Sequence, residues 1–301
     1  MQLATSKTEQ SLAGTRGFDT WPNTKILTEL LAGQRRALDA VERALPAISI
    51  AADLITSRLT DGGKLIYAGA GTSIRIAVQD GSELPATFGM AEEKIDYLIA
   101  GGRAAMFETL ADAEDDGEAG RLAAAQSCTS ADALIAVAAS GHTPYTIAAA
   151  RQARSVGCCV IAVVNNAGSP LAAAADHEVL IESGPEVISG STRMGAGTAQ
   201  KATLNLLSTL VHTRLGAVHD GFMVNVQAGN QKLVARAARI VSALSGQPMD
   251  RAESAIRTTG GHVKPAVLLL SGATDLATAQ SILSASGGNL RLALSKLPGK
   301  V

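Results

Sequence analysis

The stretch LIYAGAGTSIRIAVQDGSELPATFG, residues 65–89, decides the fold class. A short apolar run at residues 65–67 stops at a turn rich in glycine and hydroxyl side chains, and a helical pattern of apolar residues follows. A buried strand, a glycine-containing turn and a helix form the repeating unit of a parallel α/β sheet. Such a turn also suits a phosphate group, because glycine lets the backbone approach a ligand and the helix N-terminus offers free N–H groups.

Further apolar runs repeat this unit along the chain. In chain order the five runs are KLIYAG, YLIAGG, ALIAVAAS, CCVIAVVNN and HEVLIES, and helix-like stretches separate them. Continuous apolar runs that alternate with helices are typical of parallel strands covered on both faces. The sequence therefore predicts the α/β class with a doubly wound parallel sheet.

Helical patterns flank the sheet region. Apolar residues recur at helical spacing over residues 24–59 and predict two helices that break near Pro46, because proline interrupts a helix interior. One long helix is predicted over residues 196–216. The last part of the chain reads as short helices, and its segments GGHVKPAVLLL and GGNLRLAL resemble one another. We expect an N-terminal segment with helices that pack on the sheet domain, the sheet domain itself and a small helical domain, at residues 1–60, 61–239 and 240–301.

The composition is that of an ordinary globular protein. Of the 301 residues, 47% are hydrophobic and 18% are charged, and the formal net charge of -1 gives no reason to expect nucleic acid or a membrane surface as a partner. A signal peptide and a membrane-spanning run are both absent from the pattern, so we expect a cytoplasmic protein. Cys128, Cys158 and Cys159 lack the spacing of a disulfide framework or a metal site, and we expect buried thiols and no bound metal.

The glycine-rich turn at residues 69–73 departs from the two common nucleotide-binding patterns. A dinucleotide fingerprint needs a third glycine where Ile74 stands. A Walker loop needs a lysine followed by serine or threonine, and that pair is absent here. The turn is distinguished instead by its hydroxyl groups.

Hydroxyl side chains recur at three predicted turns. Thr72 and Ser73 follow the first strand, a second turn begins at Ser140, and a third contains Ser191 and Thr192 ahead of the long helix. Because the carboxyl ends of parallel strands meet at one edge of a sheet, these turns would bind a single phosphomonoester through hydroxyls and backbone amides. The alternative interpretation is that the hydroxyls only cap helices.

Four blocks, in order, carry a resemblance to a known family: GAGTSIRIAVQDGSELPATFG, AGGRAAMFETLADAEDD, AASGHTPY and GSTRMGAGTAQK. Together they closely resemble the N-acetylmuramic acid 6-phosphate etherases, which belong to the sugar isomerase (SIS) superfamily together with the glucokinase regulatory protein. The resemblance implies a SIS fold with a small C-terminal helical domain and a homodimer. It implies neither a metal nor an organic cofactor.

The resemblance also implies a reaction. The family cleaves the D-lactyl ether of N-acetylmuramic acid 6-phosphate to N-acetylglucosamine 6-phosphate and D-lactate, by elimination and then hydration, in cell-wall amino-sugar recycling. Opening the sugar to its aldehyde acidifies the C2 proton, so that one positioned base and one positioned acid suffice. Glu83 and Glu114 match the family's catalytic carboxylates: Glu83 would be the acid that releases lactate, and Glu114 the base at C2.

The resemblance extends to the phosphate-binding positions. The matching hydroxyl residues are Thr72, Ser73, Ser140 and Thr143, with Gly71 and Gly141 allowing close approach of the backbone. Ser191 and Thr192 would add hydroxyls from the third turn. For Arg193 and Lys201, added positive charge and a structural role remain equal alternatives.

The match departs from the family at a few positions. Ile74 stands where the family usually has glycine, and a branched side chain there is expected to crowd the substrate or displace the loop. Gly195 stands where many members carry a basic residue. Two alternatives therefore stay open: a non-catalytic phosphosugar-sensing regulator, and an aldose–ketose phosphosugar isomerase. Lactate release distinguishes the etherase from both.

Overall fold

The structure is a computed structural model that describes residues 6–108, 110, 112–226 and 231–297. The chain divides into two compact units: Met1–Ser82 with Glu93–Thr209, and Glu83–Glu92 with Leu210–Val301. The three-part division expected from the sequence stays a prediction, and the outermost residues of its first and last parts, 1–5 and 298–301, lie outside the described residues.

The first unit contains a five-stranded parallel sheet. Its strands are β1 (Leu65–Gly69), β2 (Ile95–Ile99), β3 (Ala133–Ala138), β4 (Cys159–Val164) and β5 (His177–Leu180). Their order in the sheet is β2-β1-β3-β4-β5, and every pairing is parallel. The five predicted strands and the doubly wound parallel sheet are thus confirmed. The direction of winding reverses between β1 and β3, which are hydrogen-bonded neighbours.

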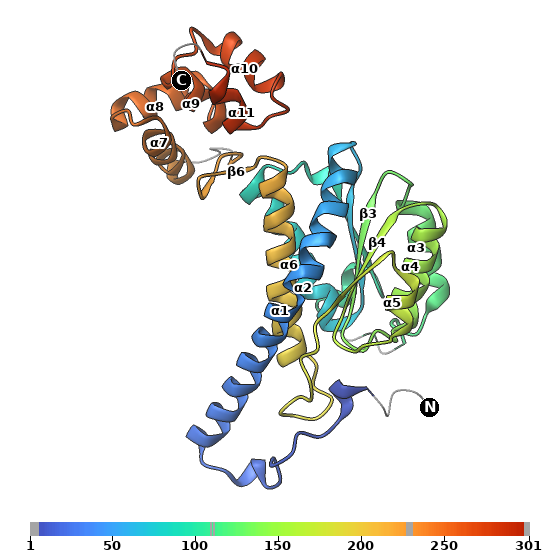
Figure 1. Ribbon diagram of the computed structural model, residues 1–301. Helices are drawn as coiled ribbons and strands as arrows, with labels where there is room; N and C mark the ends of the chain where they lie inside the picture. Colours follow the sequence, from blue (N-terminus) through green and yellow to red (C-terminus); the bar gives the residue numbers. More distant parts are fainter. Residues whose placement is uncertain (1–5, 109, 111, 227–230, 298–301) are drawn as a thin grey trace. The chain divides into compact units, whose positions relative to one another are not determined.

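Helices cover both faces of the sheet (Figure 1). They are α1 (Asn23–Thr60), α2 (Gly71–Phe88), α3 (Gly117–Ser127), α4 (Pro144–Ser155), α5 (Pro170–Ala174) and α6 (Gly195–Arg214). In Figure 1, α3, α4 and α5 lie on one face, and α1, α2 and α6 lie on the other. Short 3₁₀ helices occur in the connections: η2 (Lys7–Glu9), η3 (Phe18–Thr20), η4 (Glu92–Lys94) and η5 (Arg103–Met106).

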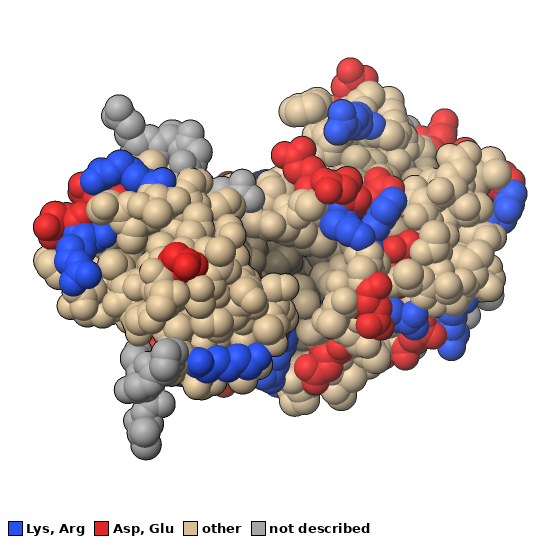
Figure 2. Space-filling model, turned by 90° about the horizontal axis from the view of Figure 1, so that it is seen from above, with Lys and Arg blue, Asp and Glu red and all other residues tan. Residues whose placement is uncertain are grey.

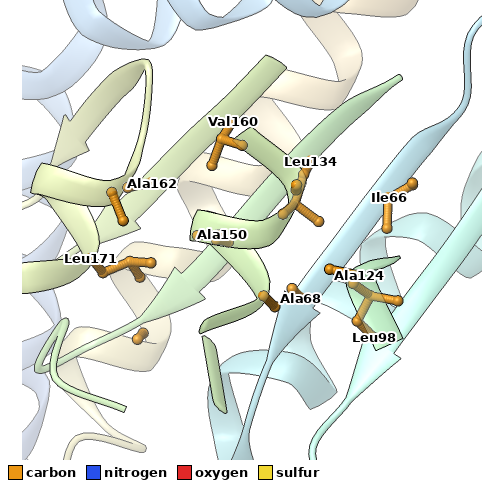
Figure 3. Close-up of a cluster of buried hydrophobic side chains, with 14 of the residues drawn as sticks. Ile66, Ala68, Leu98, Ala124, Leu134, Ala150, Val160, Ala162 and Leu171 are labelled. Atoms are coloured by element: carbon orange, nitrogen blue, oxygen red, sulfur yellow. The ribbon is translucent and has the colours of Figure 1, made fainter. Parts of the chain in front are cut away.

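Small side chains dominate the core beneath α3, α4 and α5. Alternate strand residues such as Ile66, Ala68 and Leu134 point toward these helices, and Figure 3 shows them in one cluster with Ala150 of α4. Alanine on both sides lets helix and sheet approach closely. The three cysteines are buried and unbridged, as expected from the sequence.

A buried carboxylate links the sheet to the helices of the opposite face. Asp80 of α2 is 4% exposed and accepts hydrogen bonds from the Tyr67 hydroxyl at 2.8 Å, from Asn205 Nδ2 at 2.6 Å and from Ser208 Oγ at 3.0 Å. Three donors satisfy a charge that would otherwise be costly to bury. Burial and the Asp80 charge raise the pKa of the Tyr67 phenol well above its ordinary value, so the phenol remains a donor.

The prediction of two helices broken near Pro46 is wrong. α1 is one continuous helix with Pro46 in its interior. Its buried residues lie on both sides of the proline, from Ala37 to Ile55, and this continuous buried face outweighs the cost of an interior proline, about 3 kcal/mol. His177 of β5 anchors the same region through a 2.8 Å hydrogen bond between its Nε2 and the Ala47 carbonyl oxygen.

The second unit is mainly helical, as the sequence predicts. It contains a two-stranded antiparallel pair, β6 (Val218–His219) and β7 (Phe222–Met223), and the helices α7 (Gln231–Ser245), α8 (Met249–Thr258), α9 (Val263–Leu270), α10 (Leu276–Ser284) and α11 (Leu290–Ser295). The two similar segments do form the same local structure. In each, a pair of glycines with positive φ precedes a helix, α9 after Gly261 and α11 after Gly288.

Charged side chains of both signs are interspersed over the face seen in Figure 2. Neither sign gathers there in one large patch, which agrees with the net charge of -1. Across the described residues, every helix is too short or too polar to cross a bilayer.

Gly120→Ala tests the close packing of α3 on α4. A Cβ at Gly120 would lie 2.2 Å from the Tyr145 carbonyl oxygen, so the variant should lower the free energy of unfolding by about 1–3 kcal/mol, measured by urea denaturation. Gly117→Ala on the same helix is the matched control, because its Cβ would meet no atom nearer than 3.6 Å. The control should keep its stability or gain up to about 1 kcal/mol. Equal stabilities of the two variants would contradict the packing.

Candidate active site

A cavity of about 280 Å³ lies at the carboxyl ends of β1 and β3. The two strands pair in register, with Gly69 opposite Val137, so the turns that follow them leave the same edge of the sheet side by side. This reversal point is where doubly wound sheets bind ligands. The cavity is lined by residues of both turns and by three further segments, near Glu9, Glu114 and Thr192.

The first turn brings backbone amides and hydroxyls to the cavity. Gly71, Thr72 and Ser73 all line it, and Gly71 has a φ of 53°, which glycine adopts without strain. The first helical hydrogen bond of α2 runs from Ile74 N to the Ala70 carbonyl oxygen at 3.3 Å. The amides of the three lining residues precede this bond, so the N-terminus of an 18-residue helix faces the cavity.

The expectation that Ile74 crowds the cavity is wrong. Its side chain is 1% exposed and is not part of the lining, because it packs inward against β1. A Cβ at Gly69 would lie 3.3 Å from the Ile74 Cβ, which shows how closely strand and helix approach there. The branched side chain therefore belongs to the core.

The second turn adds Ser140, His142 and Thr143 to the lining. Ser140 orients the histidine twice: its Oγ accepts from His142 N at 3.1 Å, and its carbonyl oxygen lies 2.8 Å from His142 Nδ1. Gly141 does not line the cavity. Its φ is 68°, and a Cβ there would lie 2.3 Å from Ser169 Oγ, so glycine is needed for this turn to pack against α5.

Among the described residues of the lining, Glu9, Glu114 and Asp115 carry carboxylates. Glu114 is exposed, and its carbonyl oxygen accepts from Tyr145 N at 3.0 Å, so the start of α4 holds its segment in place. The sequence interpretation included Glu114 and missed the other two. Asp115 sits in a crowded run of acidic residues that gives no signal of its own.

Glu9 reaches the cavity through contacts made by the N-terminal segment. The amide of Thr8 donates to Asn166 Oδ1 at 3.3 Å, and Asn166 Nδ2 donates to Thr8 Oγ1 at 2.9 Å. Ser189 Oγ also donates to the Glu9 carbonyl oxygen at 3.2 Å. No local sequence pattern signals these contacts, because they join residues that are far apart in the chain.

The described residues of the lining include no Lys or Arg. Arg193 is exposed outside it, and the Lys201 ammonium donates to Asn205 Oδ1 on the same helix. An anion in this cavity would therefore be held by neutral hydroxyls, backbone amides and helix ends. Among the described residues, no group of His, Cys, Asp or Glu is placed to hold a metal ion.

At the third turn the helix end is already occupied. Thr192 lines the cavity, whereas Ser191 does not. The carboxylate of Glu186, 4% exposed, accepts from Gly195 N at 2.9 Å and from Ala196 N at 2.8 Å, and so caps the N-terminus of α6. The first amides of α6 therefore already have an acceptor within the protein. The third turn offers the cavity the hydroxyl of Thr192 but no free helix N-terminus.

Glu83 does not line the cavity. It is exposed on α2, and its position after Gly71 corresponds to roughly 18 Å along the helix axis. The lining therefore contains Glu114 together with Thr72, Ser73, Ser140 and Thr143, and it does not contain Glu83.

The sheet order and the hydroxyl-lined cavity define a SIS-domain protein, and the comparisons with known proteins agree. The model of the glucokinase regulatory protein N-terminal SIS domain matches residues 47–153, and that of the SIS domain matches residues 106–210. A putative phosphosugar isomerase involved in capsule formation, from Bacteroides fragilis, has the same fold: its TM-score is 0.52 at 20% identity, covering 69% of this chain and 99% of that one.

Full-length relatives specify the family. The N-acetylmuramic acid 6-phosphate etherase of Symbiobacterium thermophilum is 44% identical over 270 residues, which is 90% of each chain. The protein of the same name from Streptomyces avermitilis is 43% identical over 300 residues, covering 99% of this chain and 96% of the relative. The chain belongs to the N-acetylmuramic acid 6-phosphate etherase family.

Glu186→Ala tests the internal cap of α6. Loss of the carboxylate leaves two buried amides without an acceptor, so the free energy of unfolding should fall by about 1–3 kcal/mol in urea denaturation. Glu182→Ala is the control, because Glu182 forms an exposed ion pair with Lys7 and should cost less than about 1 kcal/mol. If both variants lost the same stability, Glu186 would not be a cap.

Proposed function

We propose that the chain cleaves the D-lactyl ether of N-acetylmuramic acid 6-phosphate, giving N-acetylglucosamine 6-phosphate and D-lactate. The observation that carries the proposal is the cavity between β1 and β3, which combines a cradle of hydroxyls and amides with the carboxylate of Glu114. Membership of the etherase family specifies the reaction for which this combination is used.

The phosphate of the substrate would bind at the two hydroxyl turns. Thr72, Ser73, Ser140 and Thr143 supply the hydroxyl groups, and the first turn of α2 supplies backbone amides and a partial positive charge. The carboxylates on the lining repel a dianion, so they favour a pose in which the phosphate lies against the helix end and the sugar extends toward Glu114. The phosphate would thus be bound by neutral donors, without a cationic side chain.

The chemistry requires a base and an acid that act on neighbouring carbons. With the sugar open as its aldehyde, the Glu114 carboxylate removes the proton from C2. The electron pair forms the C2–C3 double bond, the C3–O bond breaks, and the departing lactate oxygen takes a proton from Glu83. Water then adds its oxygen to C3 and a proton returns to C2, which yields the product and restores both carboxyl groups.

The position of Glu83 suggests how the two carboxylates meet. It is not among the residues that line the cavity containing Glu114 in the same chain. We therefore place Glu83 of a second copy of the chain at this cavity, in a symmetric dimer in which each copy completes the site of the other.

A homodimer is supported by an exposed apolar stripe on α1. Leu27, Leu31, Leu38 and Leu45 lie within a narrow arc of the helix, and each is at least 46% exposed. Exposed leucines in one row are typical of a surface that pairs with another apolar surface. The helix that carries them is long enough to bury the stripe against a second copy.

The etherase is favoured over the two alternatives. A regulator or an isomerase would not need a carboxylate pair for ether elimination, and the full-length relatives are named as etherases. A role in peptidoglycan amino-sugar recycling in the cytoplasm belongs to the same proposal.

Lactate release from N-acetylmuramic acid 6-phosphate tests the activity. Glu83→Gln and Glu114→Gln should each lower the rate by about 10²–10⁴-fold, because each removes a proton-transfer group. Glu118→Gln is the matched control: its exposed carboxylate pairs with Arg121 on α3 and does not line the cavity, so the rate should be unchanged. A folded wild type that released no lactate would overturn the proposal.

Mixing the two glutamate variants tests the shared site. Equal amounts of Glu83→Ala and Glu114→Ala, unfolded and refolded together, should recover about a quarter of the wild-type rate. Half of the dimers would then be mixed, and one of the two sites in each mixed dimer would be intact. Recovery no greater than the sum of the separate variants would mean that both glutamates act from the same chain.

A further inference from the structure

A second cavity lies entirely within the mainly helical unit. Its volume is about 350 Å³, and its polar lining comes from Asn225, His262, Lys264 and Gln280. These residues belong to none of the four blocks that carry the family resemblance, and the proposed etherase mechanism does not use them. The cavity is large enough for a small organic molecule rather than a single water.

The lysine in this cavity is buried without an opposite charge. Lys264 is 7% exposed, and its ammonium donates one hydrogen bond, to the Gly288 carbonyl oxygen at 2.6 Å. Within the described part of the chain, no Asp or Glu oxygen forms an ion pair with it. Burial lowers its pKa to about 8. An ammonium group in such a place is stabilised by an anion, because a carbonyl dipole compensates only part of the lost hydration.

The same cavity lies at the start of a helix. His262, Val263, Lys264 and Pro265 all line it, and they are the N-cap and first turn of α9. The first helical hydrogen bond runs from Ala266 N to the His262 carbonyl oxygen at 3.4 Å, so the amides of Val263 and Lys264 precede it. The partial positive charge of the helix end therefore adds to that of the lysine.

We propose that this cavity is a binding site for a small organic or inorganic anion, a phosphate or a carboxylate, with the Lys264 ammonium as its counter-charge. The side-chain amides of Asn225 and Gln280 supply further donors at the wall. The proposal concerns a different cavity from that of the etherase reaction. Because the first cavity would also take phosphate or lactate, the measured quantity is the part of the binding that a substitution of Lys264 removes.

Calorimetric titration of the full chain tests the site, with inorganic phosphate in one series and sodium lactate in another. Lys264→Met keeps the length of the side chain and removes its charge, so the affinity of this site should fall by about tenfold or more. Lys296→Met is the matched control, since the exposed Lys296 ammonium also donates to a backbone carbonyl, that of Ala285 at 2.7 Å. The control should bind like the wild type.

A second variant covers the case in which Lys264→Met does not fold. Gln280 is exposed at the rim, so Gln280→Glu should fold normally, and its new carboxylate should weaken binding by about threefold or more. If the variants lost affinity for phosphate alone, the cavity would be a phosphate site. If they lost affinity for lactate alone, it would be a carboxylate site. If folded Lys264→Met and Gln280→Glu both bound the two anions like the wild type, the lysine would be only a structural donor to Gly288 and the proposal would fail.

Discussion

The hydrogen-bonded pairing of β1 with β3 is the constraint on which the rest of the site depends. Because these strands are parallel neighbours in register, Gly69 and Val137 end at the same edge, and the two following turns meet there. A separation by one more strand would place the hydroxyls of Ser73 and Ser140 roughly 5 Å farther apart. The part of the cavity that the two turns line, with their hydroxyls and the N-terminus of α2, results from this one pairing.

The described helix ends differ in what satisfies their first amides. The N-terminus of α2 faces the cavity, whereas Glu186 caps α6 and the Glu114 carbonyl oxygen accepts from the first turn of α4. The N-terminus of α2 is therefore left open toward the cavity, whereas the other two helix ends are satisfied within the protein. This division explains how three similar hydroxyl turns play different structural parts.

The cavity at β1 and β3 and the cavity at the start of α9 differ in the charges that line them. The cavity of the first unit is lined by carboxylates and neutral donors, which suits acid–base chemistry on a sugar whose phosphate is held by amides. The cavity of the second unit contains a buried lysine at a helix end and suits an anion without any chemistry. A helix N-terminus lies at each of these two cavities, beside carboxylates in the first and beside a lysine in the second.

The sequence by itself determined the α/β class, the five strands and the turns that carry Thr72 and Ser140, because strand and helix periodicities and glycine turns are local properties. It also pointed to Glu114 through its resemblance to a family. The tertiary structure decided whatever depends on distant contacts. Pro46 lies inside α1 because buried residues continue on both sides of it, and the Ile74 side chain packs into the core. Hydrogen bonds to Asn166 hold the segment that contains Glu9 at the cavity, and Glu186 caps the N-terminus of α6. These outcomes cannot be predicted from local sequence, because each depends on which surfaces pack together and not on the neighbouring residues in the chain.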